Sequence, residues 1–254
     1  MYPVKTYNCR CKVVAYFPNH SKDRGTGKSV ESYNKWLDEN LTSDRPKNRY
    51  FGSNQKFLVN DINKAIKDWK IEYIEPQKNS VSEMEESKII SKISKEDYTN
   101  GNCSSLALTY IGNKMGYDVE DFKSEESRLI FGDTYYIRQI AKFDGVKSII
   151  VSGKNDYQML DVLLSKIEVG KEYYLGIGNH ASIVKKTDEH YSYLNLQKDR
   201  GAWYKWGSKT AKRFGCFENN EEDTYSILID CESLEKSEDF KKILGYLNTK
   251  GIKK

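Results

Sequence analysis

The sequence lacks an excess of basic residues, a long apolar run and an abundance of histidine. The net charge of the 254 residues is only +4 although 31% of them are charged, so we expect no nucleic acid as a partner. No apolar stretch approaches the roughly 18–20 residues that cross a bilayer, so we expect no membrane partner either. Any imidazole chemistry must use His20, His180 or His190, the three histidines of the chain.

Cysteine is present, but its pattern does not suggest a disulfide framework. The chain contains five scattered cysteines, namely Cys9, Cys11, Cys103, Cys216 and Cys231. An odd, scattered set is typical of reduced thiols in a reducing compartment. The Cys9-x-Cys11 pair has no second pair at the spacing of a zinc site. We therefore expect no metal and no cofactor.

Three regions are expected along the chain. Residues 1–75 contain a candidate strand at 11–17 and two amphipathic helical patterns, the first at 29–40. Residues 76–95 are polar and are predicted to be a linker with one short helix. Residues 96–254 are predicted to form a compact α+β domain, in which a helix comes first and packs on one side of an antiparallel sheet.

The domain at 96–254 alternates between helical and strand patterns. A helix is expected directly after Cys103, ending at Gly116, because apolar residues recur there at helical spacing. Further helices are expected around 135–143, 156–167 and 237–249. Strands are expected at 147–152, 172–177, 180–186, 191–197 and 224–230.

Cys103 follows a polar turn that contains glycine and immediately precedes the expected helix. A thiol at a helix N-terminus faces backbone N–H groups and the positive end of the helix dipole, and both favour the thiolate. The same N–H groups can hold an oxyanion, for which Asn100 and Asn102 are further candidate donors. We therefore interpret Cys103 as a candidate nucleophile, which needs a base.

His180 is the candidate base, because it opens an expected strand with room around it. If Lys186 pairs with Tyr191 across the following turn, Gln197 stands opposite His180, and Asn195 lies on the same face. Either amide could orient the imidazole. The sulfur of residue 103 and the imidazole must then meet in one cleft.

The hairpin register has its own support in the sequence. With Lys186 opposite Tyr191, Leu194 and Leu196 fall together on the other, apolar face of the strand. A slip of one residue would exchange the two faces. Taken singly, a cysteine at a helix start and a histidine at a strand start are usually inert. The chain order of cysteine, histidine and amide is that of papain-fold enzymes.

The segments GNCSSLALTYIGNKMGYDV, GNHASIV and YSYLNLQ together resemble the papain-like toxin and glutamine-deamidase-like domains of bacterial and phage polymorphic proteins. The resemblance covers about 100–197. It implies a papain-like fold with a catalytic site formed by Cys103, His180 and either Asn195 or Gln197. The third position is often Asp in such deamidases and is Asn195 here, so the orienting residue is left open between the two amides.

A second resemblance concerns residues 7–37. The stretches TYNCRCKVVAYF and SVESYNKWL are similar to the end of the phage head morphogenesis (MuF) family of minor capsid proteins. This resemblance implies that the chain carries the tail of a capsid module before its second domain.

The two resemblances together predict a minor capsid-linked cysteine enzyme of a phage or prophage. It would act on an amide bond of a protein or peptide, by glutamine deamidation or by peptide hydrolysis. Expected partners are that substrate, phage head components and an immunity protein. The expected location is the virion or the bacterial cytoplasm, with delivery into a target cell. The alternatives are a structural minor capsid protein without catalysis and a peptidoglycan peptidase.

Overall fold

The computed structural model describes residues 60–78, 85–94, 96, 101–122, 124–198, 200–249 and 251. The predicted strand at 11–17, the predicted helix at 29–40 and the capsid-like stretch at 7–37 lie outside these residues. Among the described residues, no helix is long and apolar enough to cross a bilayer.

An antiparallel sheet of six strands forms the centre of a mixed α+β fold, in the order β2-β7-β3-β4-β5-β6. The strands are β2 (Ser148–Gly153), β3 (Glu172–Ile177), β4 (His180–Lys186), β5 (Tyr191–Asn195), β6 (Ala202–Lys205) and β7 (Thr224–Asp230). Their aromatic and β-branched residues suit a pleated surface. The predictions for 172–177, 180–186 and 224–230 are confirmed to the residue.

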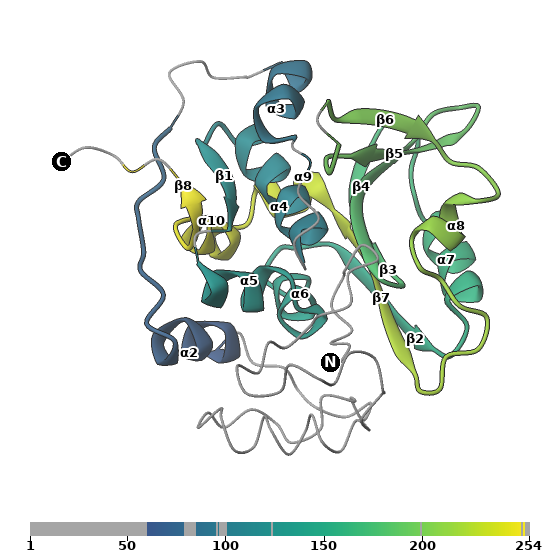
Figure 1. The fold of residues 1–254 in the computed structure, drawn as a ribbon, viewed down its shortest axis with the longest axis horizontal. Coiled ribbons are helices and arrows are strands. Elements are labelled where there is room, and N and C mark those ends of the chain that lie inside the picture. Colours follow the sequence, from purple (N-terminus) through teal and green to yellow (C-terminus); the bar gives the residue numbers. More distant parts are fainter. Residues whose placement is uncertain are drawn as a thin grey trace, which may run out of the picture.

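Helices cover both faces of this sheet, as Figure 1 shows. On one face lie α4 (Asn102–Lys114), α5 (Glu125–Phe131), α6 (Thr134–Ile140), α9 (Cys231–Glu235) and α10 (Glu238–Leu244). On the other face lie α7 (Asp156–Leu164) and α8 (Thr210–Arg213). We call these the α4 face and the α8 face. The first helix does pack on one side, as predicted, but the other side is also buried.

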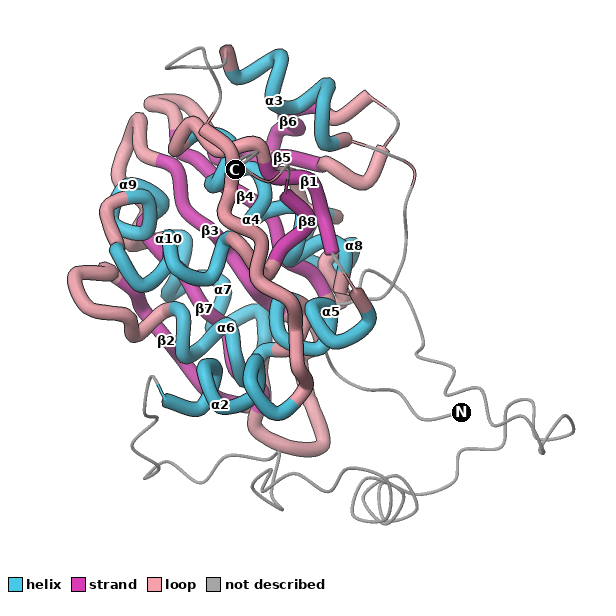
Figure 2. The backbone as a smooth tube through the Cα atoms, turned by 90° about the vertical axis from the view of Figure 1, so that its left-hand side faces the viewer, coloured by secondary structure: helices cyan, strands magenta, loops and turns pink. Residues whose placement is uncertain are grey.

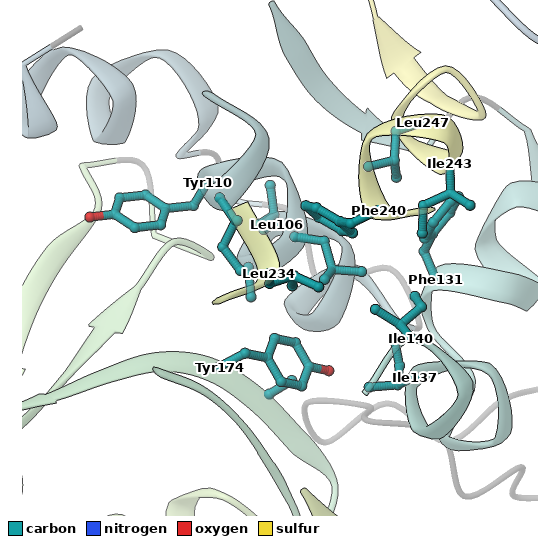
Figure 3. Packing of buried hydrophobic residues seen from close by; sticks show 14 of the residues in the cluster. Leu106, Tyr110, Phe131, Ile137, Ile140, Tyr174, Leu234, Phe240, Ile243 and Leu247 are labelled. Atoms are coloured by element: carbon teal, nitrogen blue, oxygen red, sulfur yellow. The ribbon is translucent and has the colours of Figure 1, made fainter. Parts of the chain in front are cut away.

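Side-chain alternation along the strands divides the core into two clusters. In β4, Ile183 belongs to the cluster on the α4 face, and the next residue, Val184, belongs to the cluster on the α8 face. Both side chains are fully buried. Figure 3 shows Tyr174 of β3 facing Leu106 of α4 across the larger cluster. Each face of the sheet is therefore an interior surface.

A second, two-stranded sheet was not predicted. β1 (Val119–Phe122) pairs with β8 (Leu247–Thr249) at the edge of the helical layer. The helix expected at 237–249 ends earlier, at Leu244, because Gly245 follows and Leu247 then enters the core opposite Phe122. The last third of the predicted helix is therefore wrong.

The residues before α4 pack onto the same core. In α2 (Asn60–Asp68), Ile62 and Ile66 are buried, as their helical spacing predicts. In α3 (Glu86–Ile93), three isoleucines are buried against the α4 cluster. Residues 69–78, which follow α2, run along the helical side of the molecule in Figure 2, and the backbone N–H of Ile74 donates to Gly245 O at 2.9 Å. Helix α2, before the expected boundary at 75, and helix α3, within the expected linker, therefore both pack on the core that contains α4.

Candidate active site around Cys103

Cys103 is the second residue of α4, so the helix begins slightly earlier than the predicted start directly after Cys103. The helix is preceded by Gly101, whose φ of 81° is left-handed and favours glycine. A Cβ atom at Gly101 would lie 2.9 Å from the Cα of Gly132, the residue that follows α5. The start of α4, and with it Cys103, is thus fixed by direct backbone contact with the end of α5.

The backbone hydrogen bonds of α4 begin directly after the thiol-bearing residue. The N–H groups of Ser104 and Ser105 donate to Gly101 O at 3.1 and 3.2 Å, so the intrahelical ladder begins just after Cys103. The positive end of the helix dipole coincides with this turn. The Cys103 side chain is 4% exposed and belongs to the cluster on the α4 face. Cys103 thus lies at the positive end of the helix, and its burial limits access to the thiol.

Asn102 and Asp121 form a buried polar contact beside the cysteine. The side-chain amide of Asn102 donates to Asp121 Oδ2, in β1, at 2.5 Å, and both residues are buried. The amide that we expected to serve an oxyanion is thus engaged by a carboxylate. Asp121 did not stand out in the sequence, where it is one of two acids in a short VEDF strand. Asn100, the other expected oxyanion donor, lies outside the described residues.

Polar contacts fix how α4 crosses the sheet. Near its start, the Ser104 hydroxyl lies 2.8 Å from the Tyr174 hydroxyl. Near its end, Tyr110 Oη lies 3.2 Å and Lys114 Nζ 2.9 Å from Glu172 Oε2, at the beginning of β3. The helix therefore runs antiparallel to β3, and Cys103 lies toward the end of the sheet where β3 ends and β4 begins.

His180 begins β4 at this same end of the sheet, but its side chain is on the α8 face. His180 pairs with Ile177 in the β3–β4 ladder, and directly paired side chains share a face. Ile177 belongs to the cluster on the α8 face. The imidazole also packs edge-on against Phe214 of that cluster, with ring centroids 4.4 Å apart. The sheet thus separates the His180 ring from the face on which Cys103 lies.

The predicted hairpin register is confirmed where β4 and β5 pair. Lys186 stands opposite Tyr191, and Ile183 stands opposite Leu194. Leu194 and Leu196 lie on the α4 face, which gives Asn195 the same side as His180, as predicted. That shared side is the α8 face.

Gln197 lies beyond the end of β5 and not opposite His180 in the ladder. The strand was expected to reach 197 but ends at Asn195, because Asn195 Oδ1 accepts the backbone N–H of Gln197 at 3.1 Å and turns the chain. Both amide side chains are buried. The described structure therefore gathers Asn195 with His180 on one face and leaves Cys103 on the other.

The other two described cysteines are also buried, and Cys231 is itself the first residue of α9. Burial and the charge of Asp156 raise the pKa of the Cys216 thiol to about 12. Burial, followed by the charge of Glu172, raises the pKa of the Cys231 thiol well above its ordinary value. Both thiols therefore stay protonated at neutral pH.

Within the described ranges, no group of three or more His, Cys, Asp or Glu side chains is placed to hold a metal ion. No family model, no curated protein and no solved structure matches the chain.

Proposed function

We propose that the chain is a papain-like cysteine enzyme that acts on an amide bond of a protein or peptide, with Cys103 as its nucleophile. One observation carries the proposal. Cys103 lies in the first turn of a helix that crosses the central sheet, and the start of that helix is held by the Gly101–Gly132 contact. A fixed thiol at the positive end of a helix is the arrangement that cysteine hydrolases use.

The reaction would proceed through an acyl-enzyme. The Cys103 thiolate attacks the carbonyl carbon, and a C–S bond forms while the oxygen takes the negative charge. Backbone N–H groups in the first turn of α4 stabilise that oxyanion. The C–N bond then breaks, ammonia or an amine leaves with a proton, and water hydrolyses the thioester. Glutamine deamidation and peptide hydrolysis share these steps.

The leaving amine needs a proton donor, and His180 is the proposed donor. It begins β4 at the end of the sheet toward which Cys103 lies, whereas His190 precedes β5 at the opposite end of the hairpin. The proposal requires the His180 ring to leave Phe214 and to turn across the end of β4. Asn195 or Gln197 would then orient it from the neighbouring strand.

Thiol reactivity tests this proposal. Iodoacetamide at pH 7 should alkylate Cys103 at least tenfold faster than Cys216 or Cys231, as measured by peptide mass spectrometry on the folded protein. His180→Ala should reduce the Cys103 rate if the imidazole supports the thiolate, and Cys216→Ala is the matched control that should leave it unchanged. Equal labelling of the three thiols would reject the cysteine-enzyme proposal.

A second experiment identifies the substrate bond. The wild type and Cys103→Ala are expressed side by side in a bacterial host, and growth and the masses of host proteins are compared. A gain of about 1 Da at a glutamine indicates deamidation, and new termini indicate proteolysis. Release of amines from purified cell wall would instead favour a peptidoglycan peptidase. Absence of any Cys103-dependent change in all three readouts argues against catalysis.

A non-catalytic role in a phage head is the second candidate, and a specific observation favours it. The His180 ring packs on Phe214 on the α8 face, and Cys103 is 4% exposed on the α4 face. Together with the capsid-like residues 7–37, this would place the chain in the virion as an interaction or structural protein. Co-purification with phage particles, undiminished in Cys103→Ala, together with unselective thiol labelling, would support this role.

A further inference from the structure

Two adjacent lysines of β4 have opposite electrostatic surroundings. Lys185 Nζ lies 3.5 Å from Glu86 Oε1 and 3.9 Å from Glu172 Oε1, on the α4 face. Lys186 lies on the α8 face, where its Nζ is 5.2 Å from the centre of the Tyr191 ring. No described carboxylate forms an ion pair with Lys186. The same contrast extends over the surface around it.

The chain from 191 to 216 concentrates positive charge. It contains six Lys or Arg and one Asp, a net charge of +5, whereas the whole chain has +4. The remainder of the protein is therefore close to neutral. The expectation that nucleic acid is not a partner was based on the total charge, which hides this separation.

Two cations of this region, Lys198 and Arg213, contact tyrosines. Lys198 Nζ lies 4.7 Å from the centre of the Tyr204 ring and 3.1 Å from its hydroxyl. Arg213 Nη1 donates to the Tyr193 hydroxyl at 3.1 Å. Within the described part of the chain, neither cation forms an ion pair. Since the partners are neutral, the charges stay available to an anion.

The rings themselves form a continuous group. Tyr193 of β5 stacks on Tyr204 of β6, with centroids 5.7 Å apart and planes 27° apart, and meets Trp206 edge-on at 5.9 Å. Tyr191, Tyr204 and Trp206 are each partly exposed. We call this the basic aromatic surface; it consists of Lys186, Tyr191, Lys198, Tyr204, Trp206, Lys209, Lys212 and Arg213.

We propose that the basic aromatic surface binds a single-stranded nucleic acid. Unpaired cations attract the phosphates, and partly exposed rings next to them accept unpaired bases by stacking. An acidic peptide would satisfy the cations but would not use the rings. Base pairs of a duplex are already stacked and would leave the rings unused. The surface lies on the face away from Cys103 and is independent of the proposed catalysis.

Fluorescence anisotropy tests the binding. The full chain is titrated into two fluorescently labelled single strands of about 12 nucleotides, one of deoxythymidine and one of uridine. The titration is repeated at several salt concentrations. A triple variant should weaken binding at least tenfold; it combines Lys186→Gln, Lys209→Gln and Lys212→Gln. The slope of log K against log salt should fall by about 2, since each phosphate contact contributes roughly 0.7 for a single strand.

A matched control removes the same charge elsewhere. A second triple variant replaces three lysines that pair with carboxylates of α9 and α10, by Lys236→Gln, Lys241→Gln and Lys242→Gln. This variant should keep its affinity within about twofold. Equal losses in the two triple variants would reduce the binding to a net-charge effect and overturn the proposal.

Stacking is tested separately from charge. Tyr204→Leu should weaken binding about tenfold and leave the salt slope unchanged, because it removes a ring and no charge. Thermal unfolding confirms that each variant is folded. No binding by the wild type near 100 mM salt, equal affinity for a duplex of the same length, or tighter binding of a poly-glutamate peptide would each overturn the proposal.

Discussion

The two faces of the central sheet use the same kinds of residue for different purposes. On the α4 face, Lys185 is neutralised by Glu86 and Glu172, and the Cys103 helix is held by polar contacts at both ends. On the α8 face, Lys186 and its neighbours meet rings and retain their charge. The difference indicates that the first face is built for rigidity and the second leaves its charges open to a partner.

The largest expected effect comes from breaking the α8 face at Phe214. This fully buried ring contacts His180, Tyr193 and Trp206. Phe214→Ala should lower the free energy of unfolding by about 3–5 kcal/mol, measured by urea denaturation. Phe217→Ala is the control, because Phe217 is 55% exposed, and should change it by less than about 0.5 kcal/mol. Equal effects would mean that Phe214 does not organise this face.

The next effect concerns the helix start on the α4 face. Gly101→Ala places a Cβ atom at a left-handed φ and 2.9 Å from the Cα of Gly132. It should lower the free energy of unfolding by about 3 kcal/mol. Gly116→Ala is matched, because its φ of 83° is similar but no atom lies within 4 Å of the added Cβ. Gly116→Ala should lower the free energy of unfolding by about 1 kcal/mol. A Gly101→Ala cost no larger than that of Gly116→Ala would exclude the backbone contact as the anchor.

Alkaline pH probes both faces, since Cys216 lies on the α8 face and Cys231 on the α4 face. Their pKa values are raised in the folded protein, so the folded state keeps protons that the unfolded chain loses above about pH 8.5. The free energy of unfolding should fall by about 2 kcal/mol per thiol between pH 7 and pH 10.

Single replacements assign this pH dependence. Urea denaturation gives the free energy of unfolding at pH 7 and at pH 10. In Cys216→Ala and in Cys231→Ala, the loss of stability between the two pH values should be about 2 kcal/mol smaller than in the wild type. A difference identical to that of the wild type would show that the replaced thiol ionises equally in both states.

The smallest effect compares the two lysines directly. Lys185→Met removes a partly buried charge from two carboxylates and from the Trp203 ring, and should cost about 0.5–1 kcal/mol at low salt. Lys186→Met should cost less than about 0.5 kcal/mol. The difference in stability loss between the two lysine variants, measured by thermal unfolding, should be smaller at 1 M salt. A larger cost at Lys186 would contradict the electrostatic contrast between the faces.

Local pattern was enough to predict most of the sheet and the position of Cys103. The strands at 172–177 and 180–186 follow from alternation and β-branched residues, and the pairing of Lys186 with Tyr191 follows from turn length. The place of Cys103 at the start of α4 follows from the glycine-containing turn before it and the helical spacing after it.

The placement of Cys103 and His180 on opposite faces of the sheet was already implied by the predicted register. The register prediction already placed Leu194 and Leu196 on the apolar face, and an apolar face is the one that a helix covers. The polar residues of the other parity, His180 and Asn195, therefore had to point away from α4. The contact of Asn102 with Asp121 and the pairing of β8 with β1 join distant segments, and no local signal marks them.

The pairing of β8 with β1 has a consequence for synthesis on the ribosome. Leu244 and Leu247 complete the layer that covers α4, and these residues are translated long after α4 itself. Until they emerge, the part of that layer which they cover is exposed to chaperones and to aggregation. We expect folding to be late, slow and cooperative, because its last contacts span more than half of the described chain.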